Sequence, residues 1–317
     1  MEHNNEFTGS TEKALQSKQK IDVNKVLQEA YETTKQKRTA IAGGIVWSGF
    51  ILFAAMLLVM ALANAMGIEE ESRSAILISY AVQIIIFAPL MAGIYLMALR
   101  NVLGGKANVN EAFAFLSKPW PIMAVALITT VIGQGPAMLG IENAATYLWA
   151  FFFQITFALA IIITASGQAT PLNSVLLSFN VVIKRFLGFL VLNLVIFIVT
   201  MLIAVPVIIL GVFAQLNSIA MIFAVLAGVA AIYLVFAWVI PTYFHAIAIY
   251  YRDLFAVTSV SADNKSQSYV ANSDDSFADE SEQSSTERHE LNEDGSNNEA
   301  DATSQKNSDS ESDSFKA

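Results

Sequence analysis

The chain contains no cysteine, which excludes disulfide bonds, thiolate metal sites and thiol-based catalysis. Charged residues are also scarce, at 14% of the 317 positions, whereas 55% of the residues are hydrophobic. The hydrophobic residues are concentrated between Thr39 and Ala248, in runs too long for the helices of a water-soluble domain. This distribution is typical of a membrane protein.

The features that most catalytic sites require are missing from these runs. Their central parts contain no Asp, Glu, Lys or Arg, which counts against a proton-coupled transporter and an intramembrane aspartyl protease. The motifs H-E-x-x-H, Walker A and G-x-S-x-G do not occur. His3 and His289 lie in polar segments, and His245 has no evident acid partner, so we interpret it as a packing or interfacial residue. We therefore expect no catalytic, cofactor-binding or metal-binding residue, and no enzymatic activity.

Six apolar stretches each reach the roughly 20 residues that a helix needs to cross a hydrocarbon core. They cover about 39–67, 74–99, 119–140, 144–165, 185–212 and 219–249. None shows the alternation of period two that the wall of a transmembrane barrel requires. The sequence therefore predicts an all-α, polytopic domain of six transmembrane helices over residues 22–257, preceded by a flexible polar arm over 1–21.

Basic residues are distributed unevenly between the two ends of these stretches. Seven precede the first stretch, namely Lys13, Lys18, Lys20, Lys25, Lys35, Lys37 and Arg38. The even-numbered connections and the segment after the last stretch hold Arg100, Lys106, Lys118, Lys184, Arg185 and Arg252. The odd-numbered connections hold only Arg73. The positive-inside rule therefore predicts that both termini are cytoplasmic.

Three short segments on the basic side resemble one another: DVNKVLQEAY at 22–31, NVNEAFAF at 108–115 and PLNSVLLSF at 171–179. Asn24, Asn110 and Asn173 occupy the same slot in these segments, and Phe113, Leu176 and Phe179 belong to their apolar faces. Asp22, Asn108 and Thr170 are suitable N-cap residues. The pattern predicts three repeats of a cytoplasmic amphipathic helix plus a transmembrane hairpin, with apolar faces at the headgroup boundary. The alternative is that short amphipathic loops recur by chance.

The first and third hairpins share a second pattern. PLMAGIYLMALR and PTYFHAIAIYYR both place an arginine eleven residues after a proline, at Pro89 and Arg100 and at Pro241 and Arg252. A proline can kink a membrane helix where neighbouring groups satisfy the freed carbonyl. The kink is either a hinge or, more simply, a bend that improves packing above an interfacial arginine.

At this point a family resemblance can be stated. APLMAGIYLMALRNVLGGKANVNEAFAFL, PLNSVLLSFNVVIKRFLGFLVLN and VIPTYFHAIAIYYRDLF resemble a broad superfamily of poorly characterised bacterial inner-membrane proteins over about residues 20–255. This superfamily includes the YciC-type proteins and is similar to the membrane domain fused to some glycerophosphodiester phosphodiesterases. The resemblance implies a helical bundle in the bacterial inner membrane and a role in envelope or lipid homeostasis. It supplies no catalytic residues, and the sequence contains no phosphodiesterase domain.

Uncharged amides do enter the apolar stretches, at Asn64, Gln83, Gln134, Gln154 and Asn193. Their expected role is interhelical hydrogen bonding, worth roughly 0.6 to 2 kcal/mol each. Joint lining of a substrate path is the alternative. Small residues at four-residue spacing, at Ala40, Gly44 and Ser48, predict close helix packing.

The last 60 residues, 258–317, have a different composition, rich in Ser, Asp, Glu and Asn. From Ser259 onward they hold fifteen acidic residues against four basic ones, so they account for the formal net charge of −9. Low hydrophobicity combined with high charge predicts a disordered cytoplasmic tail. Because no basic patch with interleaved aromatic residues occurs, nucleic acid is not an expected partner.

These observations favour a non-enzymatic inner-membrane protein that supports envelope or membrane-lipid homeostasis. The expected partners are membrane lipids, a second copy of the chain or other membrane proteins. The alternatives are a transporter or channel for an uncharged or lipid-like substrate, and the membrane subunit of a lipid-modifying enzyme.

The predicted orientation can be tested by cysteine labelling, because the chain has no native thiol. In intact cells, a membrane-impermeant maleimide should label Ser72→Cys, which lies in the first connection, and should not label Asn108→Cys, which lies in the second. The reverse pattern would overturn the orientation. Labelling of both sites after membrane disruption controls for buried thiols.

Overall fold

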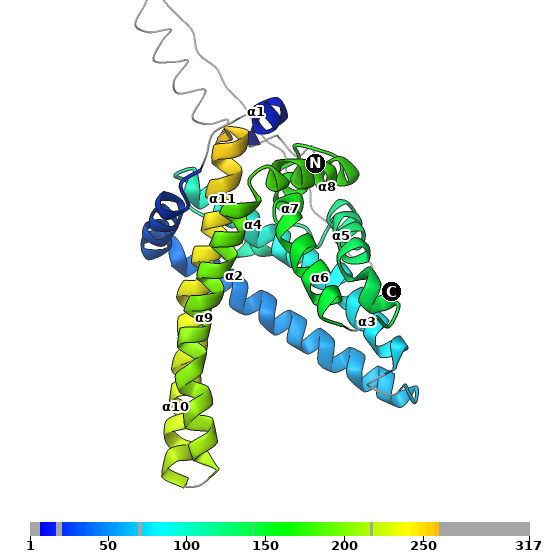
Figure 1. Cartoon of the computed structure of the whole chain (residues 1–317), viewed down its shortest axis with the longest axis vertical. Helices are drawn as coiled ribbons and strands as arrows, with labels where there is room; N and C mark the ends of the chain where they lie inside the picture. The colour runs from blue at the N-terminus through cyan, green and yellow to red at the C-terminus, as the bar shows by residue number, and fades with distance from the viewer. Residues whose placement is uncertain (1–6, 17–20, 69–71, 142, 216–217, 260–317) are drawn as a thin grey trace, which may run out of the picture. The chain divides into compact units, whose positions relative to one another are not determined.

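The computed structural model describes residues 7–16, 21–68, 72–141, 143–215 and 218–259, and most of them are helical (Figure 1). Apart from Thr258–Ser259, the predicted acidic tail lies outside the described residues, as do residues 1–6 and 17–20 of the predicted N-terminal arm.

Six helical segments are long and apolar enough to cross a membrane, which confirms the predicted number among the described residues. They are Val23–Ala65 (α2), Arg73–Val102, Trp120–Met138 (α5), Ala144–Ala165, Phe186–Ala214 (α9) and Ser218–Phe255. The first segment begins earlier than predicted because the segment predicted as a separate amphipathic helix runs directly into it. A kink at Lys37, with φ −126° and ψ 16°, marks the junction.

Three of the six segments are interrupted. Two of them contain a π-helical turn: the second consists of α3 (Arg73–Val82), η1 (Gln83–Phe87) and α4 (Ala88–Val102), and the sixth of α10 (Ser218–Leu234), η3 (Val235–Val239) and α11 (Ile240–Phe255). The fourth consists of α6 (Ala144–Thr156) and α7 (Ala160–Ala165), joined by a short turn. The fourth and fifth segments are connected through α8 (Pro171–Ile183), an α-helix where the sequence predicts one.

Two short elements near the N-terminus correct the prediction of a flexible arm over 1–21. Strand β1 (Phe7–Thr8) pairs antiparallel with β2 (Thr258–Ser259), and α1 (Thr11–Gln16) contacts α8 and α11. Phe7 and Ala14 are buried in the core. Each of these short polar segments buries one apolar residue, which gives no visible hydropathy signal in the sequence.

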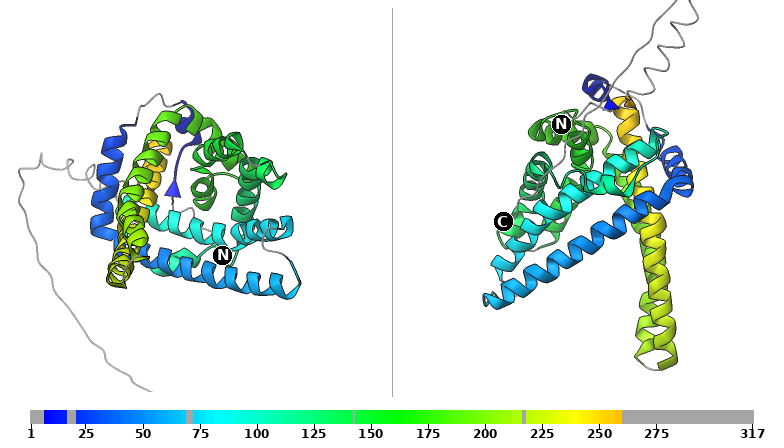
Figure 2. Two further views of the ribbon diagram at one scale, coloured as in Figure 1. Left: turned by 60° about the horizontal axis from the view of Figure 1, so that its bottom comes forward. Right: turned by 180° about the vertical axis from the view of Figure 1, so that it is seen from behind.

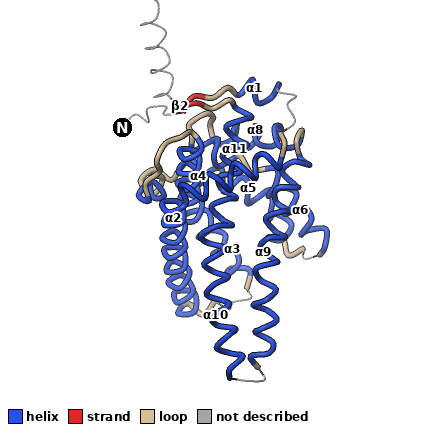
Figure 3. The backbone as a smooth tube through the Cα atoms, turned by 90° about the vertical axis from the view of Figure 1, so that its left-hand side faces the viewer, coloured by secondary structure: helices blue, strands red, loops and turns tan. Residues whose placement is uncertain are grey.

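The core lies toward one end of the six segments. Its largest buried side chains come mainly from α4 and α11, whereas α9 buries only Phe189 and Leu192 and α10 buries none. The β1–β2 pair and a hydrogen bond from Gln168 Nε2 to the carbonyl oxygen of Phe7 show that both ends of the described chain lie at this same end (Figure 3). The remaining apolar surface of α9 and α10, which pack along each other, is exposed and suits lipid.

The segment predicted as the second amphipathic helix packs closely against two membrane helices. It forms only a five-residue 3₁₀-helix, η2 (Val109–Phe113), capped by Asn108 and Glu111 in a reciprocal capping box. Gly43 and Gly44 of α2 lie against Val109 and Ala112, and Gly93 of α4 faces the backbone of Glu111 and Ala112. The predicted α-helix is therefore wrong here, because close backbone packing and the capping box favour a tight turn. Part of the predicted small-residue stripe accommodates this turn.

We expect Gly93→Ala to destabilise the protein strongly. A methyl group at this position would lie 2.6 Å from the carbonyl oxygen of Glu111 and still closer to that of Ala112, so the backbone would have to move. Overpacking of this kind costs about 1 to 3 kcal/mol. Thermal unfolding of the purified protein in detergent measures the effect. Gly211→Ala in α9 is the matched control, because nothing lies within 4 Å of the added methyl group; equal unfolding temperatures for the two variants would contradict the assigned role of Gly93.

Candidate functional site

A chain of hydrogen bonds runs through the polar end of the core and is centred on His245, whose side chain is fully buried. Thr34 Oγ1 donates to the carbonyl oxygen of Ala30 at 2.8 Å, so it accepts from His245 Nδ1, also at 2.8 Å. Asn101 Oδ1 accepts from the backbone N–H of Ala107, which directs the amide nitrogen of Asn101 toward His245 Nε2 at 3.2 Å. These bonds assign a neutral imidazole with its proton on Nδ1.

This chain joins α2, α4 and α11, and Lys37 reinforces the junction. Lys37 Nζ donates to the carbonyl oxygen of Asn101, in the last turn of α4, at 2.8 Å, and to that of Gly105, just after the helix, at 2.9 Å. A cation is favourable at a helix C-terminus, where the last carbonyl groups lack partners within the helix. The kink of α2 at Lys37 therefore coincides with the attachment of α2 to α4.

The side chain of His245 is fully buried, which agrees with its interpretation as a packing residue.

The two arginines of the proline–arginine pattern both form ion pairs with the segments that resemble one another. Arg100 pairs with Glu111 of η2. Arg252 pairs with Glu29 of α2 in a bidentate arrangement, at 2.5 and 3.1 Å, and also with Asp253. These arginines therefore connect the last helix of a membrane hairpin to η2 in one case and to the start of α2 in the other through charged hydrogen bonds.

Pro89 and Pro241, which are both buried, share another feature. Each lies six residues after the first residue of a π-helical turn, η1 in one case and η3 in the other. A proline lacks the N–H group that a regular helix uses and crowds the preceding turn, and a π-helical turn relieves this crowding by widening the helix. The π-helical turns are an irregularity that the sequence did not predict, and the predicted kink at the prolines stays a prediction.

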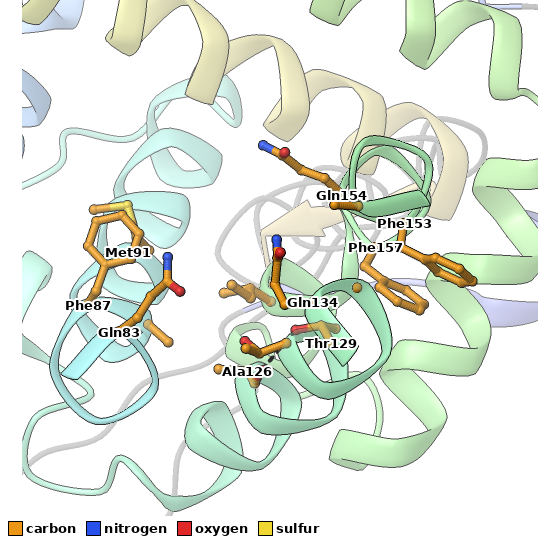
Figure 4. Close-up of a pocket in the computed structure, with 14 residues that line it drawn as sticks. Gln83, Phe87, Met91, Ala126, Thr129, Gln134, Phe153, Gln154 and Phe157 are labelled. Carbon is orange, nitrogen blue, oxygen red and sulfur yellow. Dashed lines mark hydrogen bonds between the residues drawn. The ribbon is translucent and has the colours of Figure 1, made fainter. Parts of the chain in front are cut away.

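The turn η1 also contributes to a cavity of about 340 Å³ (Figure 4). Its lining comes from the second, third and fourth membrane segments, whose backbones are shown in Figure 2. Gln83 from η1, Gln134 from α5 and Gln154 from α6 line it, together with Thr129 and Thr130 of α5. The remaining lining is apolar or aromatic and comprises Phe87, Ala88, Met91, Ala126, Gly133, Ala150, Phe153, Phe157 and Ile161. Three of the five amides identified in the sequence therefore converge on one space.

The predicted interhelical hydrogen bonds of the five amides are not formed. The side chains of Gln83, Gln134 and Gln154 make no hydrogen bond to another described residue, and that of Asn193 bonds the carbonyl oxygen of Phe189 in its own helix. Asn64 lines a different cavity, between α2 and α3. For the three glutamines, joint lining of a cavity is the arrangement that the structure supports.

The chemistry of the cavity follows from its lining. A glutamine amide offers both hydrogen-bond donors and acceptors. The hydroxyl group of Thr129 already donates to carbonyl oxygens of its own helix, so it can only accept a hydrogen bond from a ligand. All the polar side chains of the lining are amides or hydroxyls, which hold no charge at neutral pH. The cavity suits an uncharged group that carries carbonyl or hydroxyl oxygens and is attached to an apolar body, and it provides no acid or base for proton transfer.

The remaining predicted residues lie outside this cavity. Asn24, Asn110 and Asn173 are exposed and lie in the first turn of their helices. The residues that precede these helices, Asp22, Asn108 and Thr170, occupy the N-cap positions as predicted. Leu176 of α8 is exposed, whereas Phe113 and Phe179 are partly buried. Only Leu176 therefore presents most of its side chain for contact with lipid. Within the described ranges, no group of three or more metal-ligating side chains is close enough to hold an ion.

Comparison of the chain with protein-family models, curated proteins and solved structures gives no match. The resemblance to the YciC-type superfamily therefore stays a prediction.

We expect the hydrogen-bond chain to contribute measurably to stability. Asn101→Leu, which keeps the side-chain volume, would leave His245 Nε2 and the N–H of Ala107 without partners, at a cost of about 1 to 3 kcal/mol. Asn193→Leu removes only a bond within one helix and should change the unfolding temperature little. Thermal unfolding of both variants in the same detergent distinguishes the two cases, and equal losses would show that the network has no special role.

Proposed function

We propose that this chain is a non-enzymatic, multi-pass protein of the bacterial inner membrane that supports membrane-lipid homeostasis by binding an uncharged, lipid-like molecule in the glutamine-lined cavity. The observation that carries this proposal is the convergence of Gln83, Gln134 and Gln154, from three membrane segments, on one partly apolar cavity. Polar groups are costly next to hydrocarbon unless they find partners. Amides that meet no partner among the described residues are therefore available to a bound molecule.

The dimensions of the cavity narrow the class of ligand. A volume of about 340 Å³ lies at the lower end of the range for small-molecule sites, so it holds part of a lipid rather than the whole molecule. The glycerol-ester region of a membrane lipid, or a hydroxylated apolar molecule, offers the matching oxygens. Phe153 and Phe157 line the same cavity and suit the adjoining apolar part.

The proposed orientation places both termini and the even-numbered connections in the cytoplasm. The charge distribution supports it. We also propose that the chain consists of three related units, each a capped segment followed by a membrane hairpin. The support comes from the two Arg–Glu pairs and from the π-helical turns that precede Pro89 and Pro241 at the same spacing.

Transport of an uncharged or lipid-like substrate is the second candidate. The observation that favours it is the position of η1 in the cavity wall, because π-helical turns occur frequently at functional sites and Pro89 follows directly. A movement at this turn would displace Gln83 and Phe87 together. A role as the membrane subunit of a lipid-modifying enzyme would require a separate catalytic partner. Other membrane proteins and a second copy of the chain therefore stay among the proposed partners.

The cavity can be tested by removing its amides. The triple variant Gln83→Leu, Gln134→Leu and Gln154→Leu should lose at least about tenfold of any uncharged lipid that co-purifies with the wild type, because several hydrogen bonds of about 1 kcal/mol each are lost. Mass spectrometry of lipids extracted from protein purified in a mild detergent measures this.

Asn64→Leu is the matched control, since it removes a membrane-segment amide outside the cavity. An unchanged lipid profile in the triple variant would contradict lipid binding at this site. Reconstitution in vesicles separates the two candidate functions: movement of a labelled uncharged lipid between leaflets, lost in the triple variant, supports transport, whereas binding without movement supports the non-transport function.

A further inference from the structure

A second cavity, of about 610 Å³, lies at the end of the molecule that holds the core. Its polar lining includes Lys118, Gln168 and Thr170, and its apolar lining includes Leu96, Phe115 and Ile122. These residues come from α4, from α5 and the segment that leads into it, and from the connection between α7 and α8. The cavity shares no lining residue with the glutamine-lined one.

Lys118 gives this cavity its charge. No other residue of the lining is ionisable at neutral pH, and Lys118 forms no ion pair or hydrogen bond with another described residue. Two other lysines, Lys37 and Lys184, differ in this respect, because they donate to backbone carbonyl groups. Glu111, the closest acidic residue along the chain, pairs with Arg100. Among the described residues, the ammonium group of Lys118 therefore has no anionic partner that would compete with a bound ligand.

The surroundings of the cavity place it at the level of lipid headgroups. Trp120, two residues after Lys118, is 76% exposed, and an exposed tryptophan at the start of a membrane helix is typical of the interface. Helix α8, whose first residue Pro171 lines the cavity, exposes Leu172 and Leu176. A helix that buries one face in the protein and exposes leucines on another lies naturally along the membrane surface.

From this geometry we propose that the Lys118 cavity is a binding site for an anionic membrane phospholipid. Lys118 pairs with the phosphate, Thr170 and Gln168 provide the polar surface beside it, and Leu96, Phe115 and Ile122 contact the first part of an acyl chain. A negatively charged headgroup distinguishes this ligand from the uncharged group proposed for the glutamine-lined cavity. The two sites are therefore independent.

Native mass spectrometry tests the proposal with the full-length protein in detergent, titrated with phosphatidylglycerol or with zwitterionic phosphatidylcholine. The wild type should retain one phosphatidylglycerol more tightly than phosphatidylcholine. Lys118→Gln should weaken this retention about fivefold, the effect expected for one lysine at a membrane surface, and Lys118→Arg should restore it. Lys106→Gln is the matched control, because Lys106 is exposed on the same connection and does not line the cavity.

Four outcomes would overturn the proposal. Equal losses in Lys118→Gln and Lys106→Gln would indicate general attraction between the basic end and anionic lipid. Equal retention of phosphatidylglycerol and phosphatidylcholine would remove the role of charge. Displacement of phosphatidylglycerol by millimolar inorganic phosphate would show that the site recognises free phosphate rather than a lipid. Thr170→Phe, which narrows the cavity without changing its charge, should lower retention as well, and unchanged retention in that variant would contradict binding inside the cavity.

Discussion

Polar groups inside a membrane protein must satisfy one another, because hydrocarbon offers no hydrogen-bond partner. In this chain the requirement is met chiefly at the junction of α2, α4 and α11, where Thr34, Asn101 and His245 form a continuous chain of donors and acceptors. Each bond fixes the direction of the next, so the three helices have one register in which all the bonds form. The large buried side chains of α4 and α11 pack around this junction.

The junction determines where the two cavities lie. It fixes α4, which follows η1 and its first residue, Gln83, and which contains Leu96. The same helix thereby contributes to a neutral cavity along the membrane segments and to a cationic one at the end that holds the core. One rigid element thus presents two chemically different surfaces to its surroundings, the first suited to an uncharged group and the second to an anion.

Local patterns predicted the elements well, and long-range contacts explain the failures. Hydropathy located all six apolar helices, and Asp22, Asn108 and Thr170 marked the starts of their segments. The glutamines were visible in the sequence, but their convergence was not, because Gln83, Gln134 and Gln154 lie on three different segments. Likewise, no local signal connects Thr34 with His245 across 211 positions. The short form of η2 depends on Gly93, a residue of another helix.

The paired π-helical turns also set the direction of the residues that follow them. A π-helical turn contains one residue more than the α-helical turn that it replaces, so the helix after it is rotated about its axis relative to an uninterrupted α-helix. In the first and third hairpins the turn begins at the same distance before the proline, Pro89 or Pro241. Arg100 and Arg252 follow these prolines and pair with Glu111 and Glu29. Removal of one residue from either turn would therefore rotate the arginine away from its glutamate.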